Sequence, residues 1–410
     1  MTSPAPVSAD SVVDMTRALV ATDTRNPPGQ ERLAADVARQ LLEPLGATFE
    51  EVEPEPGRVS LVARIGAENM TRPTLIVNGH LDVVPINPAG WSRDPFGGAV
   101  DGGRMWGRGT ADMKGGIAAA IEAVIALGRA GRELPFDLVF HLVADEERGG
   151  QLGTRVLTSS GAVVGHACLV PEPTSLAVCI AERGILTAEV AVRGRPAHAS
   201  EPRRGISAVE KAAKVVLALH AADFGHPPHP LLGSPTANAG MISGGSGSNT
   251  VAEHCLVTVD HRTLPGQGVD DAVGDLRRLI EEIEDPELRY ELSAVVFGEA
   301  SELDADHPWV SLVQSAIASG RGAPAEVVGM TFATDARFVR NDAGIPAIVC
   351  GPGGIEQAHV DDEFVTVDAL VEAAGMYTAL FSAFDESAVE ALRARPLAVP
   401  PGGPAPTSGR

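Results

Sequence analysis

The stretch LIVNGHLDVVP, Leu75–Pro85, decides how the rest of the chain is interpreted. Its apolar first part predicts a strand that is buried on both faces of a sheet. His80 and Asp82 follow, two residues apart, at the end of that strand. Burying a neutral polar side chain without a partner costs about 2–7 kcal/mol, and burying a charge costs far more. Partners for His80 and Asp82 are therefore expected elsewhere in the chain.

Three further apolar runs also predict buried strands. Up to about residue 180, segments with the helical spacing of apolar residues separate these runs. This alternation predicts an α/β fold with a mostly parallel sheet flanked by helices. In such sheets, side chains at the carboxyl ends of the strands share one crevice. The other three predicted strands are Leu138–Val143, Cys168–Val170 and Ala347–Cys350. The polar residues that follow them are Asp145, Glu146, Glu147, Glu172 and His359, and Asp112 precedes a helical run at Ile117–Ala130.

The middle of the chain has a different pattern. The alternating segment TAEVAVRG, two predicted helices at Ile206–Leu219 and Asp270–Ile283, and strands around Cys255–His261 and Arg289–Val296 predict a compact α+β insert of ferredoxin-like type. We therefore expect a catalytic domain in two segments, 1–182 and 299–392, and an inserted domain at 183–298. The tail, 393–410, is rich in proline and glycine and is predicted to be disordered.

Composition narrows the class of protein. The 410 residues carry a net charge of −22, which would repel nucleic acid and anionic membranes. No apolar stretch approaches the roughly 20 residues of a membrane span, and the N-terminus lacks a basic start and an apolar signal core. We therefore expect a cytoplasmic protein. The four cysteines form no Cys-x-x-Cys pair, so neither a disulfide framework nor a thiolate zinc site is indicated.

The convergence of acidic side chains on one crevice indicates a metal site. Asp112, Glu146, Glu147 and Glu172 cannot all be ionised beside two histidines unless cations compensate them. Mixed histidine and carboxylate ligands suit zinc, and this number of ligands suits two ions about 3.5–4 Å apart. Asp82 then has a supporting role, because a metal-binding histidine usually donates its second ring N–H to a carboxylate.

These motifs resemble a known family. GHLDVVP, GRGTADMKGG, ADEERGG, EPT and a late AH followed by DDE are similar to the co-catalytic zinc family of acetylornithine deacetylase, succinyl-diaminopimelate desuccinylase, aminoacylase and glutamate carboxypeptidase. The resemblance runs from about residue 10 to 385. It implies that Asp112 bridges two zinc ions, with a cis peptide bond after it, and that Glu146 is the general base. It also implies that Asp82 orients a histidine. The outer ligands it implies are His80, Glu172, Glu147 and His359, and their assignment to one ion or the other stays open.

The same resemblance implies that the insert is a lid that mediates dimerisation. In GRPAHAS, His198 would then reach into the active site of the partner subunit. Asn249 in GSNTVA, Arg262 in VDHRTLP and Arg337 in TFATDARF match segments that hold the substrate. For the two arginines, a surface salt bridge is an equal alternative.

The resulting prediction is a two-zinc amide hydrolase that removes the acyl group from a small N-acyl amino acid or related amide. Cobalt is a possible substitute for zinc, and a homodimer through the lid is expected. A dipeptidase or carboxypeptidase with the same metals is the alternative. A metal-binding protein without catalysis is a third possibility, and the presence of Glu146 argues against it because such a protein needs no general base.

Overall fold

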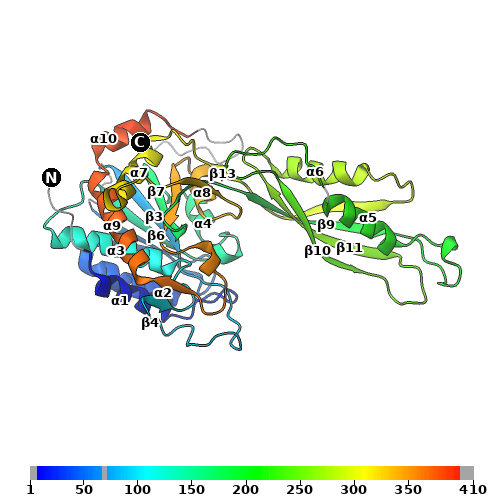
Figure 1. Ribbon diagram of the computed structural model, residues 1–410, viewed down its shortest axis with the longest axis horizontal. Coiled ribbons are helices and arrows are strands. Elements are labelled where there is room, and N and C mark those ends of the chain that lie inside the picture. Colours follow the sequence, from blue (N-terminus) through cyan, green and yellow to red (C-terminus); the bar gives the residue numbers. More distant parts are fainter. Residues whose placement is uncertain (1–6, 67–71, 221, 398–410) are drawn as a thin grey trace. The chain divides into compact units, whose positions relative to one another are not determined.

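The computed structural model describes residues 7–66, 72–220 and 222–397. Within them the chain forms two compact units, drawn in Figure 1. The larger unit runs to Ile180 and continues at Leu303–Val328 and from Thr334 onward, and the smaller unit comprises Ala181–Glu302 and Gly329–Ala333.

The larger unit contains most of a mixed sheet that has nine strands among the described residues. The four central strands, in the order β6-β3-β7-β15, are parallel to one another, and the strands toward both edges are antiparallel. The central strands are buried along their whole length, which is why their sequences are nearly continuous apolar runs. The strands are β1 (Thr48–Val52), β2 (Ser60–Ile65), β3 (Thr74–His80), β6 (Asp137–Val143), β7 (Ala167–Pro173), β8 (Val178–Glu182), β13 (Ser301–Glu302), β14 (Val327–Met330) and β15 (Ala347–Gly351).

Helices cover both faces of this sheet. The connection from β3 through α3 (Lys114–Arg129) leads to β6, and the connection from β6 through α4 (Thr154–Ser159) leads back past β3 to β7. Because crossovers between parallel strands are right-handed, these two opposite directions place α3 and α4 on opposite faces. The helices that contact α3 directly or through α9 are α1 (Ala9–Val20), α7 (Pro308–Arg321) and α9 (Val367–Ala383), while α8 (Ala336–Asn341) contacts α4.

Local sequence explains where several of these helices begin. The side chain of Ser8 accepts a hydrogen bond from the backbone N–H of Ser11 at the start of α1, and Thr366 caps α9 in the same way. Asp385 caps α10 (Glu386–Arg393), and α2 (Arg32–Leu42) packs its alanine face against β2. A small three-stranded sheet of β4 (Ala99–Asp101), β5 (Arg104–Trp106) and β16 (Phe364–Thr366) completes the unit.

The smaller unit is a four-stranded antiparallel sheet with two helices. Its strand order is β10-β11-β9-β12, and α5 and α6 pack on it (Figure 1). Along β9 buried residues alternate with more exposed ones, so one face of the strand lies in the core of this unit. The elements are β9 (Gly184–Arg193), α5 (Ala208–His220), β10 (Thr236–Gly244), β11 (His254–Thr263), α6 (Val269–Glu281) and β12 (Arg289–Gly298).

The predicted fold class is confirmed, since all four predicted buried strands are present and the insert has the expected helices. The first residues of the predicted disordered tail, 393–397, are described by the structure. Arg393 is the last residue of α10. The guanidinium of Arg395 donates a hydrogen bond to Asp304 (2.5 Å). The backbone carbonyl oxygen of Arg395 lies 3.0 Å from Nε2 of His307. The rest of the predicted disordered tail, 398–410, lies outside the described residues.

Across the part of the chain that the structure describes, no single helix is long and apolar enough to cross a membrane. The pair α9 and α10, bent by 82° at the break between them, passes that test together by length and composition.

The packing of α3 against β7 allows a test of the fold. A Cβ on Gly116 would lie 2.1 Å from the carbonyl oxygen of Pro171 in β7, whereas a Cβ on Gly128, in the same helix, would meet no atom within 4 Å. We expect Gly116→Ala to destabilise the protein by about 1–3 kcal/mol, because the helix must move off the strand. Gly128→Ala is the matched control and should stabilise it by about 0.5–1 kcal/mol. Urea unfolding of both variants in the presence of a chelator measures the difference, and equal effects would contradict the packing described.

Candidate metal centre

The carboxyl ends of the central strands bring the predicted ligands together in the larger unit. His80 is the last residue of β3, and Glu172 is the last but one of β7. Glu146 and Glu147 begin a single 3₁₀ turn, η2 (Glu146–Arg148), shortly after β6. Asp112 lies two residues before α3, and the peptide bond that follows it is cis, as predicted. The fifth ligand candidate, His359, comes from the loop between the 3₁₀ turn η4 (Ile355–Gln357) and β16.

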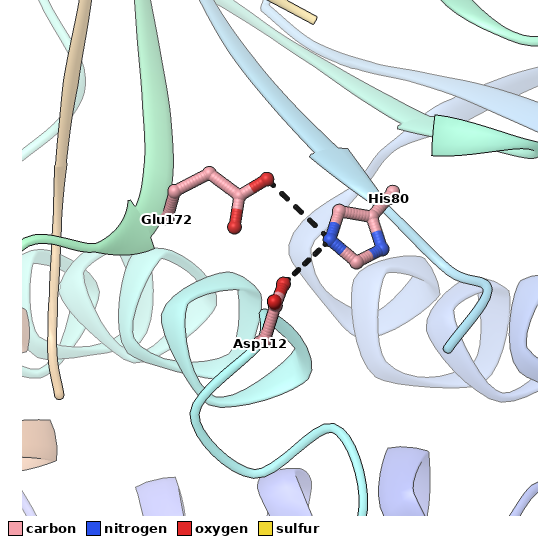
Figure 2. Close-up of side chains that lie close together, drawn as sticks. All are labelled: His80, Asp112 and Glu172. Atoms are coloured by element: carbon pink, nitrogen blue, oxygen red, sulfur yellow. Dashed lines mark hydrogen bonds and ion pairs between the residues drawn. The ribbon is translucent and has the colours of Figure 1, made fainter. Parts of the chain in front are cut away.

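One group of candidate ligands meets at the Nε2 atom of His80, as Figure 2 shows. Its Nε2 lies 2.9 Å from Oδ1 of Asp112 and 3.4 Å from Oε1 of Glu172. All three side chains are buried. A histidine nitrogen and two carboxylate oxygens thus face one point in the interior.

A second group shares Asp112 with the first. The Nε2 of His359 lies 3.3 Å from Oδ2 of Asp112 and 3.0 Å from Oε2 of Glu147. The two oxygens of the Asp112 carboxylate therefore face different histidines. In a tetrahedral site with ligand distances of about 2.1 Å, neighbouring donor atoms lie about 3.4 Å apart. The spacing of donor atoms in both groups is close to that value.

The ionisable groups of this donor set shift one another's pKa values. Burial and the nearby Asp112 carboxylate raise the pKa of Glu172 to about 8, and burial together with Asp112 also raises the pKa of Glu147. Hydrogen bonds to Asp112 and Glu147 raise the pKa of His359 to about 10. In the absence of metal, protonation of the histidines and of some carboxylates compensates the negative charge of this cluster. Metal ions would replace those protons, so the residues present fit a metal centre.

The contacts of Asp82 differ in detail from the expected pairing with a ligand histidine. The Nδ1 of His80 lies 2.8 Å from the backbone carbonyl oxygen of Asp82, and 3.7 Å from the carboxylate. The carboxylate instead accepts hydrogen bonds from the backbone N–H groups of Glu146 (3.2 Å) and Glu147 (3.3 Å). Asp82 thus orients His80 with its main chain and holds the η2 turn with its side chain.

Glu146 lies beside the two groups without belonging to either. Burial raises the pKa of its carboxyl group well above the usual range, and the Glu172 and Asp335 carboxylates act in the same direction against the opposing effect of His80. Among the described residues, none donates a hydrogen bond to its side chain. A carboxyl group with a raised pKa and no hydrogen-bond donor is suited to take up and release a proton.

Glu363 is a site residue that sequence analysis did not assign, although it ends the quoted DDE motif. It is fully buried, and its Oε1 accepts hydrogen bonds from the backbone N–H groups of Gly109 (3.0 Å), Ala111 (2.9 Å) and Asp112 (3.2 Å). Arg108 donates to its other oxygen at 2.6 Å. Glu363 therefore fixes the loop that presents Asp112, and since it follows His359 by four residues it links two ligand-bearing segments.

Arg337 lies in the same unit, and its guanidinium is engaged by the protein itself. It donates hydrogen bonds to the carbonyl oxygens of Gly149 (2.8 Å) and Thr334 (3.1 Å), and the side chain is buried. Gly149 directly follows the η2 turn, so Arg337 supports that turn from its far side. A role in substrate binding stays a prediction.

The remaining predicted site residues belong to the smaller unit. Arg262 is paired with Asp260 through two hydrogen bonds (2.7 and 3.1 Å). Asn249 lies in an exposed loop, and its backbone carbonyl oxygen accepts a hydrogen bond from the N–H of Ala199. His198 is exposed, and its Nδ1 accepts the backbone N–H of Ser200 (3.2 Å). In the neutral ring of His198 the proton then lies on Nε2, which is available as a donor.

Comparisons with known proteins identify relatives of this chain. A family described as peptidase family M20/M25/M40 matches residues 76–383. The acetylornithine deacetylase of Vibrio atlanticus (strain LGP32) is 31% identical over 363 residues, which cover 86% of this chain and 91% of the relative.

Solved structures share the fold. The M20 family metallo-carboxypeptidase Sso-CP2 from Sulfolobus solfataricus has a TM-score of 0.77 at 17% identity, covering 92% of this chain and 99% of that one. The Bacillus subtilis YxeP protein, described as a dinuclear metal binding peptidase, has a TM-score of 0.68 at 16% identity, covering 94% and 98%. Since the family match spans well over half of the chain, and the deacetylase similarity most of it, this protein belongs to peptidase family M20/M25/M40.

Proposed function

We propose that this protein removes the acyl group from small N-acyl amino acids, using two metal ions held by the groups that share Asp112. As a member of its family, the chain is a metal-dependent hydrolase of linear amide bonds. The observation that carries the proposal is the Asp112 carboxylate, whose two oxygens each face a different histidine and a different glutamate. One carboxylate shared by two ligand groups suits a dinuclear site, in which two metal ions lie about 3.5–4 Å apart.

Zinc is the proposed metal, with cobalt as a substitute. Each group offers one imidazole nitrogen and two carboxylates, a donor set that suits zinc and leaves a position for substrate or water. His80 and Glu172 would hold one ion, Glu147 and His359 the other, and Asp112 both. The bound ions would lower the pKa of a water toward about 7 and polarise a carbonyl group as Lewis acids.

The chain's own residues supply the proton transfers. The Glu146 carboxylate takes a proton from the water as its oxygen attacks the acyl carbon, and returns that proton to the amine nitrogen as the C–N bond breaks. Burial raises the pKa of Glu146 above its ordinary value, which makes its carboxylate a stronger base for the first step. Asp82 holds the backbone of Glu146 through this exchange.

The acyl group and the amino acid are proposed only as a class. Similarity to an acetylornithine deacetylase across most of both chains favours an N-acyl amino acid. A dipeptidase or carboxypeptidase activity with the same metals is the second candidate, which the shared fold with the metallo-carboxypeptidase Sso-CP2 keeps open. Side-by-side assays of N-acetyl amino acids and dipeptides separate the two. Cytoplasmic residence stays a prediction.

We also propose that the smaller unit forms the dimer interface and that its His198 completes the site of a second copy. The strand β10 is an edge of its sheet and exposes Met241 and Ile242, by 68% and 53% respectively. An exposed apolar sheet edge is suited to pairing with a symmetric copy of itself. The proton on His198 Nε2 could then stabilise the developing oxyanion of the other subunit's substrate.

Metal removal tests the metal centre directly. We expect a chelator to abolish turnover, and added zinc or cobalt to restore it, because the ions would activate the attacking water and polarise the acyl carbonyl. Native mass spectrometry of the reconstituted protein should detect two ions per chain. Full activity in protein free of transition metal would contradict the proposal.

Substitution of Glu146 tests whether this residue acts as the general base without binding the metal ions. Glu146→Ala should bind both metal ions and lose about 10²–10⁴-fold in kcat, the usual value of general acid–base catalysis. His80→Ala, the contrasting variant, should lose a metal ion because it removes the one nitrogen donor of its group. Metal content and kcat are measured on the same preparations. Near-parental turnover by Glu146→Ala would show that another group is the base.

Subunit exchange tests the shared site. Inactive Glu146→Ala and His198→Ala chains are mixed and allowed to exchange. If His198 acts in the site of the partner, each mixed dimer has one site with both residues intact and one with neither, so activity should return to as much as half the parental value. Verified exchange without any recovery of activity, or full activity of His198→Ala alone, would rule out the shared site.

A further inference from the structure

The amide side chain of Asn26 lies between two buried carboxylates, those of Asp82 and Asp145. Its Nδ2 donates hydrogen bonds to Oδ2 of Asp82 (2.9 Å) and to Oδ1 of Asp145 (3.2 Å). Asn26 is only 3% exposed. Both neighbours are acceptors when ionised, so the amide must present its NH₂ group, and both of its hydrogens are used.

The main chain around Asn26 is fixed against the strand that carries His80. The backbone N–H of Asn26 donates to the carbonyl of Val83 (2.9 Å), and the N–H of Val83 donates to the carbonyl of Thr24 (3.1 Å). The hydroxyl of Thr24 donates to the carbonyl of Leu81 (2.6 Å) and accepts from Nζ of the buried Lys114 (3.0 Å). The amide of Asn26 therefore has a defined position relative to Asp82.

The second carboxylate, Asp145, closes the loop that contains the η2 turn. Its Oδ2 accepts the backbone N–H of Leu152 (3.1 Å), and its carbonyl accepts the N–H of Gly150 (2.7 Å). Arg58 donates to its Oδ1 (2.9 Å), and Arg58 is itself held by two oxygens of the fully buried Glu31. The charge of Asp145 is thus compensated inside the protein.

Asn26 joins these two halves. Among the described residues it is the only side chain that donates a hydrogen bond to the Asp82 carboxylate, whose remaining hydrogen bonds come from the N–H groups of Glu146 and Glu147. On the opposite side, Asp145 directly precedes those two residues. Without a hydrogen-bond donor between them, the ionised carboxylates of Asp82 and Asp145 would repel each other.

We infer that Asn26 is a positioning residue that fixes Asp82 against Asp145 and so sets the η2 turn that presents Glu146 and Glu147. The inference rests on the proposed function for its catalytic consequence. Its structural half, the ordering of the turn, is independent of catalysis. Displacements of about 1 Å in a catalytic group can cost 10²-fold in rate, so loss of one amide should be visible in turnover.

The kinetic test compares Asn26→Ala with the matched control Asp23→Asn. Asp23 lies on the same segment and is partly exposed, and its side chain contacts Arg25. Asn26→Ala should lower kcat about 10–100-fold with KM within about threefold of the parent, because Glu146 acts on the transition state more than on the bound substrate. Its affinity for Zn²⁺, titrated into metal-free protein, should also fall, since Glu147 is displaced. Asp23→Asn should match the parent in both.

A further variant guards against a general loss of folding. Asn26→Ser retains a hydroxyl that can donate to only one of the two carboxylates, so its kcat should lie between those of the parent and Asn26→Ala. The double variant Asn26→Ala/Asp145→Ala should be no slower than the slower single variant, because the two residues act as one unit. Losses that multiply in the double variant, or that follow the folded fraction in thermal unfolding, would overturn the inference.

Hydrogen exchange separates this inference from the proposed function. In metal-free protein, peptides that cover residues 145–152 should exchange their amide hydrogens faster in Asn26→Ala than in the parent or in Asp23→Asn. Failure of the parent to bind metal or hydrolyse any amide counts against the proposed function alone. Unchanged exchange in Asn26→Ala overturns the positioning role, whether or not the parent is active.

Discussion

The Asp112 carboxylate is the constraint on which the rest of the site depends. Its two oxygens point to two histidines, and hydrogen bonds from His359 and His80 hold its pKa well below the usual range even though burial opposes this. Each oxygen of this carboxylate must keep its direction toward one histidine. The main chain that carries Asp112 must therefore be held in place as well. Glu363 does this through three backbone N–H groups, and Gly109 adopts a φ of +87° in the same loop, a conformation that favours glycine.

Much of the larger unit could be predicted from the sequence because its central strands are buried on both faces. The run Leu75–Val77 predicts such a strand, which the structure extends to Thr74–His80. Strands at the sheet edges were not predicted. β1 has mostly exposed side chains, and β13 is two residues long, so neither has a periodic apolar signal. The mixed character of the sheet comes from these edges.

The candidate ligands could be predicted because each one follows a buried strand or precedes a helix, and because unpaired buried charge needs compensation. The residues that hold the ligands could not. Asp82 was expected to pair with His80 through its carboxylate, but the main-chain carbonyl is closer to the ring. Glu363 and Asn26 bind backbone amides or carboxylates far away in sequence. Any residue except proline can supply a main-chain N–H. The sequence therefore has no motif that identifies the donor of such a hydrogen bond.

Three acidic side chains use the same device, a buried carboxylate that accepts main-chain N–H groups of a loop: Glu363 on the loop of Asp112, Asp82 on the η2 turn, and Asp145 on Leu152. This leaves the ligand side chains free to face the metal ions. It also adds negative charge to a site that already has an excess. Arg108 compensates Glu363 and Arg58 compensates Asp145, whereas the Asp82 carboxylate forms no salt bridge with an arginine or lysine among the described residues and is attracted only at longer range by the buried Lys114. Burial raises its pKa, and the neighbouring His80 and Asn26 oppose that effect. Metal ions held by the neighbouring ligands would favour the ionised form of Asp82, which accepts the backbone N–H groups of Glu146 and Glu147, so metal binding would support the order of the η2 turn through this carboxylate.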